Sequence, residues 1–366
     1  MQPTILQILP SLDYGGVERG TIEVANELVK RNHRSIVISA TGRLVPELIA
    51  SGSEHIDLPI GEKSIKSIKF IPKLSRLFIE KNVDIVHVRS RLPAWLTHFA
   101  LKKIQPEKKP ILITTVHGPY TVNRYSKIMM SGHRVIAISK YIKKYIIKNY
   151  PDIDKNKIEI IPRGVNNNEY YSDYKPISSW TESWIKEFPN LENKFLITLP
   201  ARITRWKGQS DFIEIITKLK KKGFNVHGLI VGGVDKIKRK YLQELKTLVK
   251  KNNIEAQISF TGHRDDIKNI LSISDIVLSL AKTPEAFGRT TLEALALGVP
   301  VIAYNHGGAK EILEDLFPKG RTEPHNIDKA VTLVEKFYKS RPKIKNKNIY
   351  TLDNMLNKTI SIYNSV

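Results

Sequence analysis

Residues 284–308 read PEAFGRTTLEALALGVPVIAYNHGG, and this segment carries the pattern that decides the fold. Its part 289–297 has the spacing of a short helix, Gly298 follows, and the apolar run 300–303 has the length of a buried strand. Helices and strands that alternate over such short distances are typical of parallel βαβ units.

The same alternation extends through the rest of the chain. In the first half, expected strands lie at 4–9, 35–39, 83–88, 111–116 and 134–138, with helical spacing in 17–31 and 72–81. In the second half, further strands are expected at 195–199, 226–231, 257–260 and 275–280, with helices at 209–221, 235–252 and 265–272. The stretch 163–194 has no clear period and is expected to hold the connection, whereas the tail 326–366 looks helical.

These patterns predict an α/β fold of two doubly wound, Rossmann-like domains that face each other. Such domains bind ligands at the carboxyl ends of their strands. We expect a first domain at 1–168, a second at 169–340, and a C-terminal helix at 341–366.

Bulk composition limits the class of protein. A chain of 366 residues suits two domains, and the absence of cysteine excludes a disulfide scaffold, a thiolate nucleophile and a cysteine metal site. Residues 4–9 run directly into a strand rather than a secretory signal, and no run reaches the ~18 apolar residues of a spanning helix. We therefore expect a cytoplasmic protein.

The net charge of +23 arises from 59 Lys and Arg against 36 Asp and Glu. Such an excess can favour phosphorylated substrates, anionic lipid or nucleic acid, but the lysines are scattered, so a solvated surface in a lysine-rich composition explains it equally well. The segment 63–76 interleaves basic and apolar residues, so an anionic membrane surface is one expected partner, although core packing also explains its apolar residues. Nucleic-acid binding stays a remote alternative, because no zinc finger, RNP-like motif or concentrated basic helix is present.

In the second half, cations and carboxylates follow the ends of two expected strands. Arg202 and Lys207 lie in the loop after 195–199, where a guanidinium and an ammonium can converge on one anion. Glu285 precedes the Phe287-Gly288 turn, and Glu293 lies in the helix that this turn opens. That helix start is a candidate phosphate site, to which Thr290 and Thr291 add hydroxyl donors.

In the first half, the strand ends carry glycine, histidine and arginine. Gly15-Gly16 forms a βα turn that fits neither the G-x-G-x-x-G nor the P-loop pattern. His117 ends the strand 111–116, where its imidazole can hydrogen-bond a substrate hydroxyl or help transfer a proton. Five further residues near these strand ends are expected on the acceptor side of the site, where they would orient the substrate whose hydroxyl reacts. They are Tyr14, Arg89, Arg91, Tyr120 and Arg163.

No metal site is expected. Asp152-Ile153-Asp154 matches an Asp-x-Asp pattern but precedes a strand, at the end of the sheet away from the expected ligand site. No His, Asp or Glu spacing suggests zinc, and we expect no cofactor.

Taken together, these motifs resemble the retaining, nucleotide-sugar-dependent glycosyltransferases of family 4, which have the GT-B fold. The resemblance covers essentially the whole chain, and its most specific element is Glu-x(7)-Glu at Glu285 and Glu293. Arg202, Lys207-Gly208, Gly15-Gly16, His117, the segment 161–165 and Gly307-Gly308 with Glu311 support it. Asn166 departs from the Asp that many relatives have after Gly-Val.

This resemblance implies a role for each matching residue. Arg202 and Lys207 would bind the donor diphosphate, Glu293 the ribose and Glu285 the hydroxyls of the donor sugar. The implied catalytic set is His117, Glu285, Arg202 and Lys207. The implied donor-binding set is Gly16, Arg202, Lys207, Gly262, His263, Glu285, Phe287, Gly288, Arg289, Thr290, Thr291 and Glu293.

The expected activity is metal-independent, retaining transfer of a sugar from a UDP- or GDP-sugar to a lipid-linked or cell-envelope glycan. The protein would then be cytoplasmic and peripheral to the inner face of the plasma membrane. The alternatives are other GT-B activities, namely a nucleotide-sugar epimerase or a synthase of a soluble, phosphate-bearing disaccharide.

Overall fold

The computed structural model describes residues 2–13, 15–62, 64–234, 239–344 and 348–366, which form two compact units. Unit 1 comprises Met1–Arg163 and Leu352–Val366, and unit 2 comprises Gly164–Thr351. The side chain of Arg163 is buried in unit 1, whereas Val165 forms a β-bridge with Thr351 inside unit 2. The chain therefore enters unit 2 at residue 164 rather than 169, and returns to unit 1 at 352 rather than 341.

Unit 1 is built on a seven-stranded parallel sheet with the order β3-β2-β1-β4-β5-β6-β7. Its strands are β1 (Thr4–Ser11), β2 (Arg34–Ala40), β3 (Glu54–Asp57), β4 (Ile85–Val88), β5 (Ile111–Val116), β6 (Arg134–Ala137) and β7 (Ile158–Ile160). The strand order reverses between β1 and β4, the point at which doubly wound sheets bind ligands.

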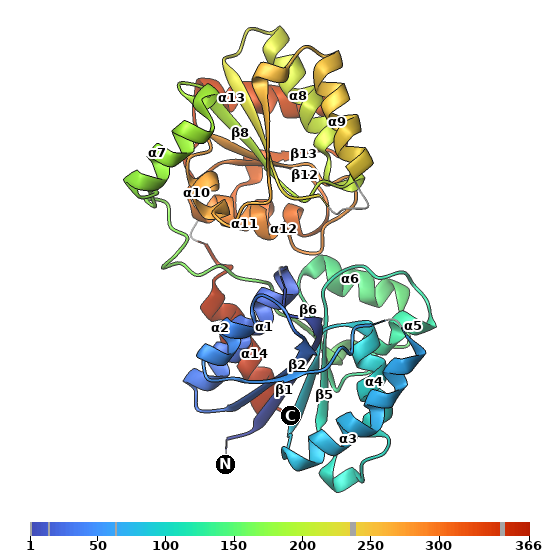
Figure 1. Ribbon diagram of the computed structural model, residues 1–366. Helices are drawn as coiled ribbons and strands as arrows, with labels where there is room; N and C mark the ends of the chain where they lie inside the picture. The colour runs from blue at the N-terminus through green and yellow to red at the C-terminus, as the bar shows by residue number, and fades with distance from the viewer. Residues whose placement is uncertain (1, 14, 63, 235–238, 345–347) are drawn as a thin grey trace. The chain divides into compact units, whose positions relative to one another are not determined.

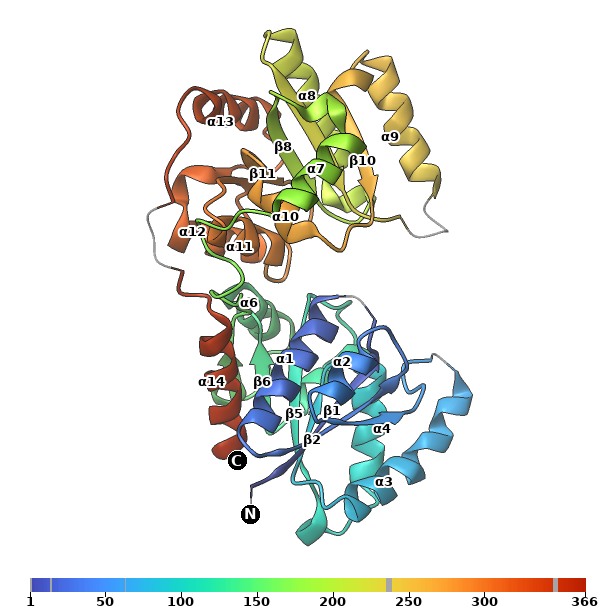
Figure 2. The same cartoon turned by 60° about the vertical axis from the view of Figure 1, so that its left-hand side comes forward.

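Helices cover both faces of this sheet (Figure 1). They are α1 (Gly16–Lys30), α2 (Val45–Ala50), α3 (Phe70–Glu80), α4 (Arg91–Leu101), α5 (Arg124–Lys127), α6 (Lys140–Asn149) and α14 (Leu352–Asn364). The C-terminal helix α14 lies beside α1 (Figure 2) and buries Met355, Leu356 and Tyr363 in one core cluster with Ile5 and Val24. The last helix of the chain is thus part of unit 1.

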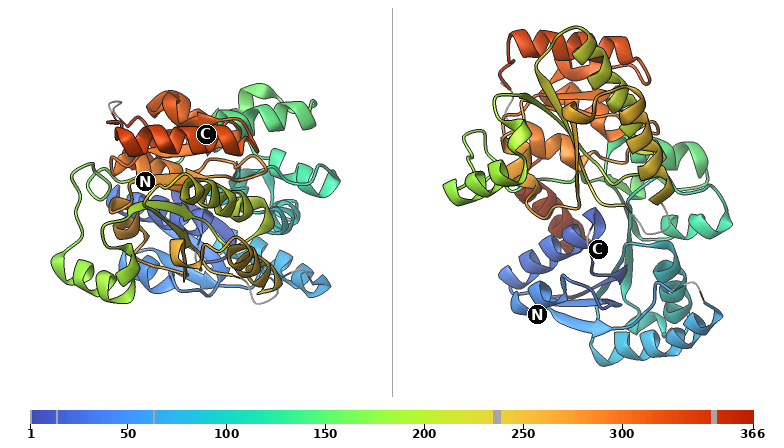
Figure 3. Two further views of the ribbon diagram at one scale, coloured as in Figure 1. Left: turned by 90° about the horizontal axis from the view of Figure 1, so that it is seen from above. Right: turned by 45° about the horizontal axis from the view of Figure 1, so that its top comes forward.

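Unit 2 is built on a six-stranded parallel sheet with the order β10-β9-β8-β11-β12-β13. Its strands are β8 (Phe195–Pro200), β9 (Val226–Val231), β10 (Ile258–Gly262), β11 (Ile276–Ser279), β12 (Val301–Tyr304) and β13 (Arg321–Thr322). Its helices are α7 (Ser178–Glu187), α8 (Gln209–Lys221), α9 (Arg239–Lys251), α10 (Ile267–Ser272), α11 (Arg289–Ala296), α12 (Gly307–Leu316) and α13 (Ile327–Lys339). Figure 3 shows α13 alongside α8.

The predicted α/β class with two doubly wound domains is confirmed, but several elements were not expected or differ in extent. The edge strands β3 and β13 were not predicted, because both are short and polar. Helix α7 lies inside 163–194, where its period is carried by Trp180, Trp184 and Phe188, which pack with Leu196 and Leu229. The polar residues between these aromatic side chains mask the helical period in the sequence.

The C-terminal helix begins at Leu352, not at about 341. Pro342 and the polar residues around it account for the later start. Some of the sequence predictions fall on residues that lie outside the described part of the chain. They are 345–347 of the expected C-terminal helix, 235–238 of the helix expected at 235–252, Lys63 of the basic segment, and the acceptor-side candidate Tyr14. Within the part of the chain that is described, no helix has the length and apolar character needed to cross a membrane.

Candidate active site

The first element of the site in unit 2 is an ion pair between Lys207 and Glu285. Lys207 lies in the β8–α8 loop, and Gly208 follows it with a φ of +80°. A Cβ atom at Gly208 would lie 2.0 Å from the carbonyl oxygen of Leu280, so glycine lets this loop pass against the end of β11. Lys207 Nζ thereby contacts Glu285 Oε1, with side chains that are 21% and 12% exposed.

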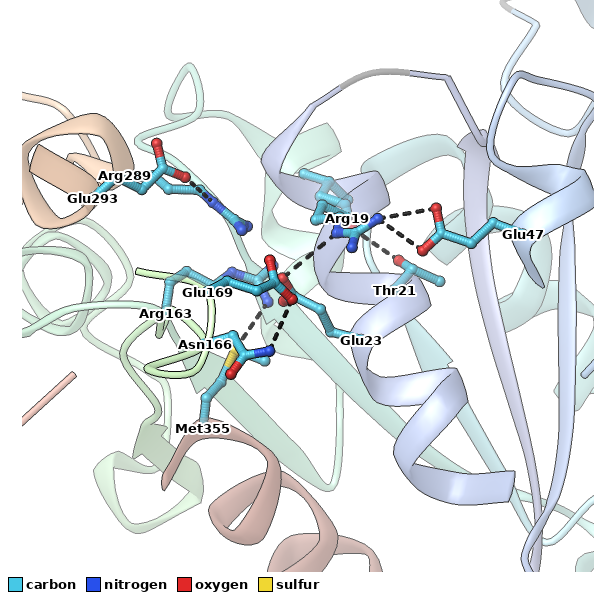
Figure 4. A network of polar contacts seen from close by, with 11 residues as sticks. Arg19, Thr21, Glu23, Glu47, Arg163, Asn166, Glu169, Arg289, Glu293 and Met355 are labelled. Atoms are coloured by element: carbon cyan, nitrogen blue, oxygen red, sulfur yellow. Dashed lines mark hydrogen bonds and ion pairs between the residues drawn. The ribbon is translucent and has the colours of Figure 1, made fainter. Parts of the chain in front are cut away.

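The second element is the start of α11. Gly288 adopts a φ of +94° at the N-cap position, and Arg289 Nε contacts Glu293 Oε1 at 2.8 Å one helical turn later (Figure 4). Thr291 is fully buried, and its hydroxyl has no hydrogen-bond partner among the described residues. The first N–H groups of a helix lack intrahelical partners, so this terminus combines free donors with a cation and a carboxylate.

Gly307 and Gly308 support the segment that carries Glu285. A Cβ atom at Gly307 would lie 2.5 Å from the Glu285 carbonyl oxygen, and one at Gly308 would lie 2.3 Å from Phe287 Cα. The N–H of Gly308 donates to the Glu285 carbonyl at 2.8 Å. The glycine pair therefore lets the start of α12 hold residues 285–287 by direct backbone contact.

A buried carboxylate, Asp211, braces the same loops and was not identified from the sequence. It accepts hydrogen bonds from Tyr304 Oη at 2.6 Å and forms an ion pair with Lys282 at 2.7 Å. Burial raises the pKa of Asp211, but its contacts with Lys282 and Tyr304 outweigh this and hold the pKa below its usual value. The backbone N–H of Lys282 also donates to Trp206, next to Lys207, at 2.6 Å.

Arg202 and His263 are not brought into these ion pairs. The Arg202 side chain is exposed, and its carbonyl accepts a hydrogen bond from Gln209. Gly262 has a φ of +73° at the end of β10, and the exposed His263 ring contacts Asp265 at 3.1 Å. Arg202, Gly262 and His263 nevertheless lie at the carboxyl edge of the sheet. The predicted residues Phe287 and Thr290 lie at the same edge.

In unit 1, the carboxyl edge of the sheet brings His117 and Arg163 together. Arg163 Nη2 lies 3.1 Å from His117 Nδ1, and the backbone N–H of His117 donates to Tyr120 Oη at 3.4 Å. His117 Nε2 is buried without a hydrogen-bond partner in the described part of the chain. Burial, and then the nearby charges of Arg163 and Arg89, lower the pKa of His117 well below its usual value.

The other arginines predicted for this edge have neutral partners. Arg89 follows β4, is 3% exposed, and donates from Nε to the Gln7 side-chain oxygen at 3.1 Å. The guanidinium of Arg91 stacks 4.9 Å from the centre of the Tyr120 ring.

Gly16 begins α1, and a Cβ atom there would meet nothing within 4 Å. The start of α1 is therefore open to a ligand.

The Asp152–Asp154 pattern precedes β7 and so lies away from the carboxyl edge of the unit 1 sheet. Asp152 pairs with Lys127 at 3.1 Å, and Asp154 accepts a hydrogen bond from the N–H of Asn156. Among the residues that the structure describes, no three His, Asp or Glu side chains form a group that could hold a metal ion.

Two doubly wound parallel sheets with charged loops at their carboxyl edges are the architecture expected of the GT-B class, and solved structural neighbours belong to this class. Residues 14–169 match the family model described as Glycosyltransferase Family 4, and residues 181–351 match the model described as Glycosyl transferases group 1. Together the two models match most of the chain, which therefore belongs to these glycosyltransferases.

Solved structures agree with this assignment. A glycosyltransferase from Rickettsia africae is 32% identical, with 100% of this chain and 98% of that chain covered and a TM-score of 0.87. HepE from Anabaena, solved in complex with UDP-glucose, is 19% identical over 99% of this chain and all of HepE, with a TM-score of 0.83. The latter similarity shows the shared fold.

Curated relatives match over shorter regions. An O-antigen biosynthesis glycosyltransferase of Escherichia coli, WclY, is 28% identical over 236 residues, or 62% of each protein. The chain spans about three fifths of the length, or less, of the first curated relatives that it matches.

Proposed function

We propose that this protein is a retaining glycosyltransferase that transfers a sugar from a UDP- or GDP-sugar to an acceptor hydroxyl. The observation that carries this proposal is the arrangement around Gly288, where Lys207 pairs with Glu285 and Arg289 pairs with Glu293. Each pair offers a cation for a diphosphate and a carboxylate for a hydroxyl-rich group.

In the proposed complex, Lys207, Arg202 and the start of α11 bind the diphosphate. Glu293 accepts hydrogen bonds from the ribose hydroxyls, and Glu285 accepts them from the hydroxyls of the transferred sugar. The complex of HepE with UDP-glucose supports a nucleotide sugar as the donor class.

The proposed chemistry is a front-face substitution. The bond between the anomeric carbon and the phosphate oxygen breaks, and the acceptor oxygen forms its bond to the same face of that carbon. The acceptor proton passes to the departing phosphate oxygen, and the nucleoside diphosphate leaves. Lys207 and Arg202 stabilise the charge that develops on the diphosphate, while the carboxylates orient the sugar, so the proposed reaction needs no metal.

For the acceptor, we propose a lipid-linked or cell-envelope glycan, with the protein peripheral to an anionic membrane surface. The O-antigen assignment of the relative WclY supports a glycan acceptor, and the net charge of +23 supports attraction to an anionic surface.

A thermal-shift panel of UDP, GDP, ADP and their sugars tests the donor. A ligand that binds the folded state raises its stability by mass action, so we expect one base series to raise the melting temperature. Product analysis then separates the activities. Transfer to an added glycan acceptor supports the proposal, an altered sugar formed from the donor alone indicates an epimerase, and a product formed only with a sugar phosphate indicates a disaccharide-phosphate synthase. If no nucleotide or nucleotide sugar shifts the melting temperature, the donor proposal fails.

A further inference from the structure

The contact between Arg163 and His117 has a consequence for the chemistry of the histidine. Arg163 Nη2 lies 3.1 Å from His117 Nδ1, while His117 Nε2 is buried without a partner in the described residues. Both residues belong to unit 1, so the contact does not depend on how the two units are placed.

Arg163 is held in this position by its surroundings. Its side chain is 8% exposed, and its Nη1 lies 3.7 Å from the Met355 sulfur on α14 (Figure 4). On α1, a Cβ atom at Gly20 would lie 2.3 Å from the same Nη1. Glycine inside a helix costs about 1 kcal/mol relative to alanine, and here it leaves the space that the guanidinium occupies.

A guanidinium can only donate hydrogen bonds and keeps its proton at all accessible pH values. The nitrogen that faces Arg163, His117 Nδ1, must therefore be the acceptor. A neutral imidazole carries one N–H, so the proton of His117 is on Nε2, the nitrogen without a protein partner.

We infer that Arg163 is a positioning residue that fixes His117 as its Nε2–H tautomer, so that His117 donates a hydrogen bond to an oxygen of the sugar substrate rather than accepting a proton. This inference rests on the proposed glycosyl transfer and selects one of the two roles that the sequence left open for His117. It also explains why α1 has a glycine at position 20.

The surrounding charges favour the same neutral state. The charged or titratable groups near the ring are Arg163 after β7, Arg89 after β4, His87 on β4 and Tyr120 after β5. Burial first, and then Arg163, Arg89 and His87, lower the pKa of His117. A positively charged imidazole beside Arg163 would also place two donors against each other.

Nitrogen NMR of histidine-labelled, full-length protein tests the tautomer, with His117→Asn used to assign the signal. We expect protonated Nε2 and unprotonated Nδ1 in the wild type and in Arg163→Lys, which keeps a donor. Arg163→Met and Gly20→Ala should both give a mixture of tautomers, since the first removes the donor and the second displaces it. Lys30→Ala, at an exposed position of the same helix, is the control and should leave the tautomer unchanged.

Kinetics provide the second readout. In Arg163→Met and Gly20→Ala we expect kcat to fall about tenfold or more, with a smaller change in the KM for the donor and partial rescue in Arg163→Lys. Gly20→Ala keeps the charge of Arg163 and improves the helix, so it separates positioning from stability. A wild-type proton on Nδ1, or a Gly20→Ala variant with unchanged tautomer and kcat, would overturn the inference. If the wild type transfers no sugar at all, the proposed function fails, while the NMR result still decides the role of Arg163.

Discussion

Both units place arginine or lysine at the carboxyl edge of a parallel sheet, but the side chains that contact these cations differ. In unit 1, Arg89 and Arg163 are almost completely buried and contact the neutral side chains of Gln7 and His117. In unit 2, Lys207 and Arg289 are more exposed and contact the carboxylates Glu285 and Glu293.

We therefore distinguish a fixed edge in unit 1, where the contacts of the arginines are costly to break, from an exchangeable edge in unit 2, where the cations can change partners. A buried guanidinium that donates to a neutral group determines which atoms of that group can donate or accept, and it is costly to move. A partly exposed ion pair contributes little net stability, so an incoming diphosphate can take over the cation and leave the carboxylate to the hydroxyls of the ligand. On this view, unit 1 orients neutral groups and unit 2 exchanges partners on binding.

The largest effect is expected from breaking the Lys207–Glu285 pair. Lys207→Ala removes the proposed contact with the diphosphate and leaves Glu285 unpaired, and we expect kcat to fall about 10²- to 10³-fold. Glu285→Ala should cost a similar factor, while both variants keep the wild-type circular dichroism spectrum.

The matched control is Lys218→Ala, which breaks an ion pair with Asp328 on the outer surface of unit 2. This variant should keep wild-type kcat and a nearly unchanged melting temperature. Near-normal turnover in purified Lys207→Ala and Glu285→Ala would remove both residues from the catalytic assignment.

The second effect concerns the support of the exchangeable edge. Gly307 has a φ of +60°, and a Cβ atom there would lie 2.5 Å from the Glu285 carbonyl oxygen. We expect Gly307→Ala to lower the free energy of unfolding by about 3 kcal/mol, because backbone strain adds to a steric clash. UDP-induced stabilisation should also be lost, since residues 285–287 must move.

Gly223→Ala provides the comparison for this variant. Gly223 has a φ of +81°, but a Cβ atom there would meet nothing within 4 Å. It should cost about 1 kcal/mol from backbone strain alone and leave UDP binding intact. Equal losses in the two urea titrations would show that the contact with Glu285 is unimportant.

The sequence predicted the two sheets well because most parallel strands are buried on both faces and form continuous apolar runs. β9 (Val226–Val231) is one example, and every residue in it is buried. The edge strand β3 has partly exposed, polar residues and gives no such signal. The start of α14 was placed too early because helical spacing alone does not locate a helix end.

The candidate site shows a similar division. Motif spacing placed Lys207, Glu285 and Glu293 at one sheet edge, but it did not predict that each carboxylate would hold a cation. The close approach of Arg163 to Gly20 could not be predicted, because the two residues are far apart in the chain and only the folded structure brings them together. An interior glycine in an expected helix was the one available signal, since such a residue is costly unless packing requires it.

Acid should affect the stability of both units through neutral, buried histidines. Burial, and then the charges of Arg89 and Arg163, lower the pKa of His87 well below 6.5, and burial lowers the pKa of His227 to about 4. Each group binds a proton in the unfolded state before it does so in the folded state. The stability is therefore fully present above pH 6.5 and is lost as the pH falls towards the folded-state pKa.

Urea titrations between pH 7.5 and 4.0 measure this loss, which is at most about 1.4 kcal/mol per pH unit for each histidine. His87→Asn should flatten the dependence of the free energy of unfolding on pH between 6.5 and 5.0, and His227→Asn should do so between 6.5 and about 4. Stability that increases on acidification over this range would contradict the neutral state of these side chains.

The smallest effect is expected from Arg289, and it tests directly whether the unit 2 pairs exchange partners. In Arg289→Met, UDP loses one cation and meets a Glu293 carboxylate that no longer contacts Arg289, so we expect its Kd to rise about fivefold, or roughly 1 kcal/mol. Uridine has the ribose but no phosphate, and its Kd should stay within about twofold, because Glu293 remains available to the ribose hydroxyls. Calorimetric titration with both ligands measures the difference. If uridine weakens as much as UDP does, Arg289 acts by orienting Glu293, and this pair in unit 2 would then be as fixed as the contact between Arg163 and His117 in unit 1.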